Sequence, residues 1–257
     1  MTTVLKLGGS LITEKASPET VDDAALDDAL DAVATAVAGE GGPGGDSTVD
    51  LVLVHGGGSF GHYHAAERGV TASTGTGDAR DVVAIHDAMG RLNATVVQRL
   101  HDRRVDALPV RPLSLASRGA DGDLDLPTRG VERMLAEGFC PVLHGDGVVQ
   151  AGAGVTVLSG DEVVVSLARS LSVDRVGLCS TVPGVLDAGG DVVERIDRFA
   201  DVEATLGGSD ATDVTGGMAG KVRTLLELPV PAHVFGPDGL RAFLDGGAPG
   251  TLVAGSE

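Results

Sequence analysis

The sequence predicts an α/β protein with a largely parallel β-sheet. Two observations support this class: short runs of β-branched residues alternate with helical stretches, and glycine-rich turns follow several of these runs. The chain has 257 residues, 42% of them hydrophobic, which suffices for one large core or two closely joined ones. No apolar run approaches the roughly 20 residues that span a bilayer, and we expect no leader segment before the first strand-like run. We therefore expect a cytoplasmic protein.

The elements are expected in a fixed order along the chain. Val21–Val37 has the spacing of an amphipathic helix, and Thr20–Asp23 resembles a capping box at its start. Gly39–Ser47 is typical of a surface loop. Strands are expected at Thr3–Leu7, Asp50–Val54, Val105–Val110, Cys140–Leu143, Val173–Cys179, Ala232–Phe235 and Thr251–Ala254, a hairpin within Val148–Leu158, and further helices at Asp81–Arg103, from Ser159 to about Leu171, and at Val214–Leu226.

Charge and composition exclude some function classes. The formal net charge is −18, with 26 Asp and 11 Glu, and the acidic residues are dispersed over the chain. Nucleic-acid binding calls for basic patches, so we expect no nucleic-acid partner. An acidic coat with little lysine indicates adaptation to high ionic strength, where salt screens the self-repulsion. Cys140 and Cys179 lie in apolar runs and are expected to be buried free thiols.

Lysine is nearly absent, and its positions are informative. The chain has three lysines against sixteen arginines: Lys6 in Lys6–Ser10, Lys15 nine residues later, and Lys221 at the end of Thr215–Lys221. Two of these segments are glycine-rich, and the third lysine lies close to one of them. Backbone N–H groups in such turns can hold a phosphate while an ammonium group neutralises its charge. The pattern therefore favours phosphate binding over chance survival of surface lysines.

Other motifs fit the glycine-rich segments less well. Gly56–Gly61 matches the G-x-G-x-x-G fingerprint of dinucleotide-binding proteins, but that fingerprint does not account for the lysines. A P-loop at Gly216–Lys221 is rejected, because Val222 replaces the hydroxyl residue that binds Mg²⁺ and Thr215 replaces the first glycine. A zinc site has the wrong ligand spacing. Its imidazoles would come from His55, His62, His64 and His86.

Taken together, the motifs resemble those of the amino acid kinase superfamily over nearly the whole chain, from residue 3 to about 254. They are Lys6–Ser10, Lys15, His55–His62, His144–Asp146, Ser159–Asp161 and Thr215–Lys221. Within the superfamily the chain most resembles the isopentenyl phosphate kinases. His62 is the discriminating residue, and the related fosfomycin kinases share it. The resemblance implies the amino acid kinase fold, a three-layer αβα sandwich. It also implies a single domain, residues 1–257, with an acceptor-binding lobe (1–175) and a nucleotide-binding lobe (176–257).

The resemblance further implies ATP- and Mg²⁺-dependent phosphorylation of isopentenyl phosphate to isopentenyl diphosphate, in a mevalonate-type isoprenoid route. It favours a homodimer and, with the acidic composition, a salt-adapted archaeal host. Two alternatives stay open: a kinase of the same fold for another phosphate or phosphonate such as fosfomycin, and a non-catalytic nucleotide sensor. The implied catalytic residues are Lys6, Lys15, His62, Asp161 and Lys221.

The implied binding residues form two sets. The nucleotide set is Gly8, Gly9, Ser10, Thr181, Gly184, Gly216, Gly217, Met218 and Gly220. The acceptor set is Gly56, Gly57, Gly58, Gly61, His62, Gly145 and Asp146, with Ile85, Met89 and Leu92 as candidates for an apolar slot beside Ala65 and Val70. No protein ligand for the metal is implied, because Mg²⁺ is expected on the ATP phosphates. Simpler roles stay open: a helix-terminal acid for Asp161, a turn aspartate for Asp146 and a surface residue for His62.

Overall fold

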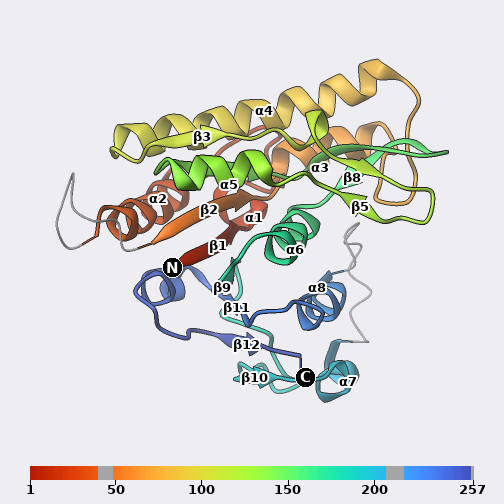
Figure 1. The fold of residues 1–257 in the computed structure, drawn as a ribbon. Coiled ribbons are helices and arrows are strands. Elements are labelled where there is room, and N and C mark those ends of the chain that lie inside the picture. Colours follow the sequence, from red (N-terminus) through yellow and green to blue (C-terminus); the bar gives the residue numbers. More distant parts are fainter. Residues whose placement is uncertain (40–48, 207–216, 256–257) are drawn as a thin grey trace.

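A largely parallel β-sheet forms the centre of the molecule (Figure 1). This computed structural model describes residues 1–39, 49–206 and 217–255, and within them the sheet has eight strands in the order β10-β12-β11-β9-β1-β2-β6-β3. Neighbouring strands are parallel except β11 and β12. The strands are β1 (Thr2–Leu7), β2 (Asp50–His55), β3 (Ala107–Pro109), β6 (Cys140–His144), β9 (Arg175–Cys179), β10 (Arg195–Ile196), β11 (Ala232–Phe235) and β12 (Thr251–Val253).

Helices cover both faces of this sheet, so the predicted three-layer sandwich is confirmed. One face packs against α1 (Gly9–Ile12), α2 (Asp23–Ala38), α4 (Ala79–Asp102) and α9 (Leu240–Leu244). The other packs against α5 (Arg129–Ala136), α6 (Gly160–Ser170) and α8 (Gly217–Leu226). The remaining helices are α3 (Gly58–Glu67), α7 (Glu203–Leu206) and the 3₁₀ turns η1 (Pro112–Ser114), η2 (Phe199–Asp201) and η3 (Pro237–Gly239).

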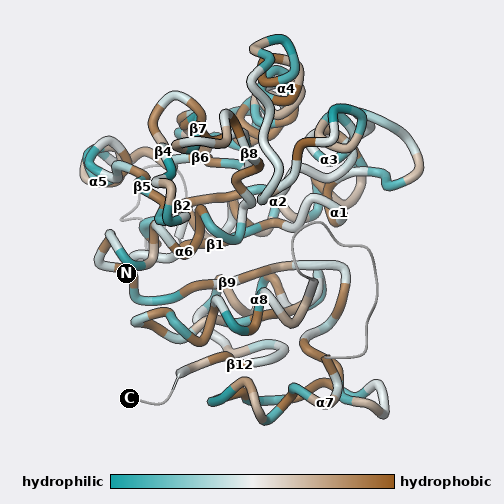
Figure 2. Tube along the Cα trace, turned by 90° about the vertical axis from the view of Figure 1, so that its right-hand side faces the viewer, coloured by the Kyte–Doolittle hydropathy of each residue, from teal (hydrophilic) through white to brown (hydrophobic). Residues whose placement is uncertain are grey.

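Strand periodicity decides which layer each side chain of β1 enters. Leu5 and Leu7 belong to the core under α2 and α4, whereas Val4 belongs to the core under α6. Because alternate residues of a strand point to opposite faces, Lys6 shares the face of Val4. The chain thereby directs its one charged β1 side chain towards α6. The buried strand β9 is likewise hydrophobic over much of its length (Figure 2).

A smaller sheet lies beside the main one, in the order β5-β4-β7-β8. The predicted hairpin within residues 148–158 is confirmed as the antiparallel pair β7 and β8. A segment between α3 and α4 joins it, because Thr76 forms a bridge with Val155. The strands are β4 (Ser117–Arg118), β5 (Leu124–Asp125), β7 (Asp146–Gln150) and β8 (Gly154–Leu158).

Most predicted elements are present within one to four residues of their expected bounds. The sequence analysis did not predict the short elements α1, β4, β5, α5, β10, α7 and α9. It also missed α3, because it took residues 55–62 as a glycine-rich turn, whereas the structure continues them into a helix. Gly58 and Gly61 lower the helix propensity there, and packing against α4 compensates for it. The loop at residues 39–47 and the start of the helix expected from residue 214 lie outside the described residues, apart from Gly39. None of the described helices is long and apolar enough to cross a membrane.

Candidate active site

A cavity of about 930 Å³ opens where four parallel strands end. Gly8, Gly56, Gly145 and Ser180 are the first residues after β1, β2, β6 and β9, and all four line the cavity. Backbone hydrogen bonds extend the sheet by one residue here, from Gly8 N to Cys179 O (2.8 Å) and from Gly56 N to Leu7 O (2.9 Å). Ligands of α/β sheets commonly bind at this edge.

The two glycine-rich turns pack against each other at the floor of the cavity. A Cβ atom on Gly9 would lie 2.1 Å from Gly58 N, so only glycine fits there. Gly58 has a φ of 46°, in the left-handed region, and its Cβ would lie 2.0 Å from Thr13 Oγ1. The Thr13 hydroxyl in turn accepts from Ser59 N at 3.0 Å. The glycines therefore bring two backbone turns into contact, and both line the cavity.

Lys6 and Lys221 meet at a shared carboxylate. Lys6 Nζ lies 2.7 Å from Asp161 Oδ1, and Lys221 Nζ lies 4.0 Å from Asp161 Oδ2. The three side chains are 11%, 20% and 22% exposed for Lys6, Lys221 and Asp161. Burial alone would raise the pKa of Asp161, but the two lysine charges and the hydrogen bond from Lys6 outweigh it and hold that pKa below its ordinary value. The fold thus brings two lysines that lie far apart in the sequence to one carboxylate.

Helix α6 positions this carboxylate. Ser159 is its N-cap and accepts from Glu162 N at 3.2 Å, while Glu162 Oε2 accepts from Ser159 N at 2.8 Å. These two hydrogen bonds form a capping box, which places Asp161 in the first turn of α6. Asp161 accordingly occupies a position that favours an acid through the helix dipole. Asp161 therefore both complements the dipole of α6 and pairs with the two lysines.

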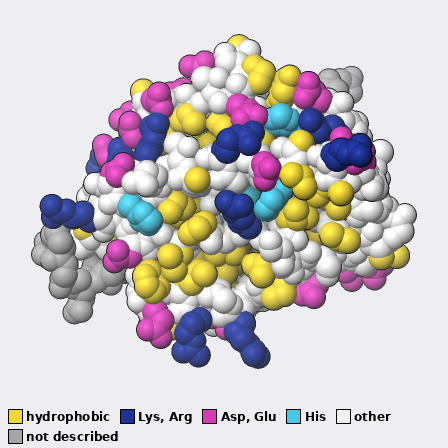
Figure 3. Space-filling model, turned by 90° about the horizontal axis from the view of Figure 1, so that it is seen from above, with side chains coloured by type: hydrophobic (Ala, Val, Ile, Leu, Met, Phe, Trp, Pro, Cys, Tyr) yellow, Lys and Arg dark blue, Asp and Glu magenta, His cyan; other side chains and the backbone are white. Residues whose placement is uncertain are grey.

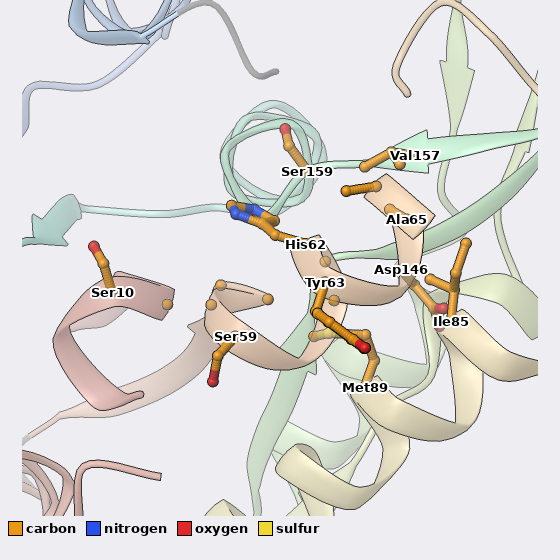
Figure 4. Close-up of a pocket in the computed structure, with 18 of the residues that line it drawn as sticks. Ser10, Ser59, His62, Tyr63, Ala65, Ile85, Met89, Asp146, Val157 and Ser159 are labelled. Atoms are coloured by element: carbon orange, nitrogen blue, oxygen red, sulfur yellow. The ribbon is translucent and has the colours of Figure 1, made fainter. Parts of the chain in front are cut away.

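Lys15 and His62 line the same cavity from other elements. Lys15 is exposed in the segment that joins α1 to α2, and His62 is exposed on α3. His62 extends from α3 towards the start of α6 at Ser159, with Ser10 on the far side of the cavity (Figure 4). The cavity therefore gathers three lysines and one histidine around the glycine-rich turns.

One end of the cavity is apolar. Ala65, Val70 and Ile85 form a small buried cluster, against which Val157 packs, and Met89 adds a side chain that is 1% exposed. Ala65 faces Val157 across this end (Figure 4). The expectation for Leu92 was wrong: its side chain packs in the main core and does not line the cavity, because it lies on the α4 face that meets the sheet.

Asp146, which was expected on the acceptor side, lines the cavity and is also held by other parts of the protein. Its carboxylate is fully buried and accepts from Gly147 N at 2.8 Å and Leu113 N at 3.3 Å. His86 Nδ1 lies 2.9 Å from the same carboxylate. These contacts hold the Asp146 carboxylate in place.

Two buried histidines lie under the glycine turns. His55 and His144 are cross-strand neighbours at the ends of β2 and β6, and their rings stack with centroids 5.4 Å apart. Their Nδ1 atoms lie 3.1 Å from Gly56 O and 2.8 Å from Gly145 O. Burial lowers the pKa of each to about 4, so both are neutral at pH 7. Each ring thus donates to a carbonyl of a cavity-lining glycine.

The remaining expected residues lie on the C-terminal side. Among them Thr181, Gly184, Met218 and Gly220 do not line the cavity, although their neighbours Ser180 and Lys221 do. Gly216 lies outside the described residues. Among the described residues no group of three or more His, Cys, Asp or Glu side chains is placed to hold a metal ion. Cys140 and Cys179 are buried and free, as expected.

The sequence analysis did not predict Tyr63, Val157 and Ser180 as cavity residues. Only for Ser180 did the sequence carry a signal: it directly follows a predicted strand, as the glycines of the cavity do.

Comparison with known proteins identifies the family. The model of the Amino acid kinase family matches residues 1–230. The chain belongs to this family. A dinucleotide-binding interpretation of Gly56–Gly61 is therefore set aside.

Individual relatives share one description. An isopentenyl phosphate kinase of Haloferax volcanii is 60% identical over 252 residues, which cover 98% of both chains. The isopentenyl phosphate kinase of Methanocaldococcus jannaschii is 31% identical over 91% of this chain and 90% of its own. X-ray structures of isopentenyl phosphate kinase superpose with a TM-score of 0.78 at 25% identity and cover 98% of this chain and 100% of the other. An aspartate kinase from Synechocystis shares the fold (TM-score 0.67, 15% identity), and this chain covers 40% of it.

Proposed function

We propose that this protein is an ATP-dependent kinase that phosphorylates isopentenyl phosphate to isopentenyl diphosphate. The supporting observation is the meeting of Lys6 and Lys221 at Asp161, in a cavity that also contains Lys15 and His62. The near full-length identity of 60% to an isopentenyl phosphate kinase supports the choice of acceptor. The cavity combines a cationic end for phosphates with an apolar end for a small hydrocarbon tail.

Phosphoryl transfer requires positioning and positive charge more than covalent catalysis. In our proposal an ionised oxygen of the acceptor phosphate attacks the γ-phosphorus of ATP. The bond from that phosphorus to the β,γ-bridging oxygen breaks, and ADP leaves. Phosphate monoesters have a second pKa near 6, so the attacking oxygen needs no general base at pH 7.

Each cationic residue then has a distinct role. Lys6 and Lys221 flank the transferred phosphoryl group and offset the charge on its equatorial oxygens, while Asp161 fixes the positions of their ammonium groups. Lys15 binds the β- and γ-phosphates of ATP. The backbone N–H groups of Gly8, Gly9, Ser10 and Gly56–Gly58 serve as additional donors to the phosphate oxygens.

His62 binds the acceptor phosphate and holds its attacking oxygen in place. The alkenyl tail lies in the apolar end, among Ala65, Ile85 and Met89. Burying each CH₂ group of such a tail contributes about 0.8 kcal/mol, so shape restriction by these side chains, more than affinity, selects a short tail.

The wider setting is inferred in the same way. Residues 1–175 form the acceptor lobe and residues 176–257 the nucleotide lobe, including Thr181, Gly184 and residues 216–220. Mg²⁺ enters on the ATP phosphates and supplies further charge neutralisation. Membership of the family favours a homodimer. The net charge of −18 favours a cytoplasm of high ionic strength. The face around α4 mixes acidic and basic side chains with apolar patches (Figure 3).

A coupled ADP-release assay tests the proposal. The protein is assayed in high KCl with Mg²⁺ and ATP against isopentenyl phosphate, dimethylallyl phosphate, fosfomycin, UMP and acetylglutamate. We expect the highest kcat/KM with isopentenyl phosphate. A preference for fosfomycin or UMP would overturn the acceptor, and ADP release that ignores every acceptor would favour the sensor alternative.

A further inference from the structure

The segment that carries Lys15 is a narrow loop between α1 and α2. Its two arms meet through Glu14 N to Thr20 O (3.0 Å) and Asp22 N to Ile12 O (3.0 Å). Lys15 lies near the tip, exposed and on the cavity wall. A long side chain at the tip of such a loop reaches a defined point in the cavity only if the loop itself is held in place.

Glu19 lies on the returning arm of this loop in an unusual backbone conformation. Its φ is 49°, and Arg104 is the only other non-glycine residue with a positive φ in the described part of the chain. Left-handed backbone disfavours a glutamate, and such strain persists only where the surroundings over-determine it. The Glu19 N–H donates to Ser59 O at 3.2 Å, which ties the backbone of the arm to the start of α3.

The Glu19 side chain joins the loop to two helices. Arg91 of α4 donates to it from Nε (3.0 Å) and from Nη2 to both carboxylate oxygens (2.7 Å each). His64 Nε2 of α3 lies 2.5 Å from Glu19 Oε1. The hydrogen bonds from Arg91 and then His64 hold the pKa of Glu19 below its ordinary value, so the carboxylate is ionised at pH 7.

The tautomer of His64 follows from its other neighbour. Arg68 Nη1 lies 3.1 Å from His64 Nδ1, and a guanidinium group can only donate. His64 Nδ1 must therefore accept, which leaves the proton on Nε2 and directs it at Glu19. His64 lies two residues after His62 on α3, so the contact joins the Lys15 loop to the helix that carries the acceptor-side histidine.

We propose that Glu19 is a positioning residue: it fixes the Lys15 loop to α3 and α4 and thereby sets the distance between the donor-side lysine and the acceptor-side His62. The inference rests on the proposed function only in that Lys15 binds the ATP phosphates. The left-handed backbone of Glu19 and its hydrogen bonds from Arg91 both restrict where the tip of the loop can move. Glu19 itself does not line the cavity.

We call the contacts of Glu19 with Arg91, His64 and Ser59 the Glu19 clamp, and three variants test it. Glu19→Gln and Arg91→Met remove the ion pair, and Glu19→Gly removes both the ion pair and the backbone strain. We expect each to raise KM for ATP about tenfold, the factor that corresponds to about 1.4 kcal/mol, with KM for the acceptor changed less. The dissociation constant of a non-hydrolysable ATP analogue, measured by calorimetry, should rise by the same factor. Glu19→Gly should do so while the melting temperature stays level or rises, which a merely structural role would not produce.

Two matched controls accompany them. Asp27→Asn removes a carboxylate that bridges Arg99 and Arg103 between α2 and α4, away from the loop. Arg104→Gly relieves the other positive φ. Both should leave KM for ATP and analogue affinity unchanged.

The outcomes distinguish a failure of the proposed role of Glu19 from a failure of the proposed kinase function. Wild-type ATP affinity in all three Glu19 and Arg91 variants, or equal losses in the controls, would overturn the clamp. If the wild type binds the analogue but turns over no isopentenyl phosphate, while Glu19→Gln weakens analogue binding, the clamp stands and the proposed acceptor fails. A wild type that does not bind the analogue would overturn both.

Discussion

Replacing Asp161 with asparagine tests the centre of the proposed mechanism. The substitution keeps the shape of the side chain and removes the one negative charge between Lys6 and Lys221. Two unit charges 4 Å apart interact by about 4 kcal/mol at an effective dielectric constant of 20. The Asp161–Lys221 separation is 4.0 Å, and the side chains are 20–22% exposed, so we take about half of this value, about 2 kcal/mol, after screening by water.

That amount corresponds to a fall of about 30-fold in kcat if it is lost from the transition state. Without the carboxylate the two ammonium groups repel each other and must be repositioned as the phosphoryl group transfers. ADP release at saturating ATP and isopentenyl phosphate measures the effect, and the melting temperature reports whether the fold survives.

Asp23→Asn is the matched control. Asp23 lies in the first turn of α2, as Asp161 lies in the first turn of α6, but it pairs with Arg99 on the surface. If Asp161 served only the helix dipole, both variants would lose similar stability and neither would lose rate. A kcat within threefold of wild type in Asp161→Asn would refute the reasoning.

Further predictions concern the histidines and the glycine turns. His62→Ala should lower kcat/KM for isopentenyl phosphate by about 10²-fold with the melting temperature retained, because a preorganised charge donor is lost; near-normal turnover would remove the assignment. Gly9→Ala should prevent close packing against Gly58 and abolish activity, and a soluble variant with full turnover would contradict the steric argument. His55 and His144 have folded pKa values of about 4 against 6.5 unfolded, so the unfolded state binds more protons between these values. The contribution of the two neutral histidines to the free energy of unfolding is therefore complete above about pH 6.5. It is lost as the pH drops towards 4, by about 3 kcal/mol per histidine. Urea unfolding between pH 4.5 and 7.5 measures how the free energy of unfolding changes with pH. His144→Gln should reduce the number of protons taken up on unfolding by about one. The same pH dependence in the variant and the wild type would count against buried neutral rings.

Regular patterns made the sheet and its glycine turns predictable. The apolar run of β1 and the glycines after it could be read locally, and alternation along the strand places Lys6 on the α6 side. Helix α3 was missed because two glycines lower its local propensity, and its stability comes from contacts with α4 that lie outside any local window.

Side-chain partners were harder to foresee than elements. Glu19 and Arg91 are 72 residues apart, and nothing local to either residue indicates the pair. Asp146 shows the same limit, since its position beside the cavity was anticipated but its burial among Leu113 N, Gly147 N and His86 was not. Local sequence identified which residue types gather at the strand ends, and long-range packing decided which of them face the cavity.

Phosphorus NMR of the reaction mixture tests the central claim most directly. With wild-type protein, ATP, Mg²⁺ and isopentenyl phosphate, we predict that the monophosphate resonance of the acceptor is replaced by the two coupled resonances of a diphosphate as ADP accumulates. Lys6→Ala and Lys221→Ala, each folded by its melting temperature, should slow this conversion about 10²-fold or more. Conversion at the wild-type rate in either variant, or an acceptor resonance unchanged with the wild type, would contradict the account.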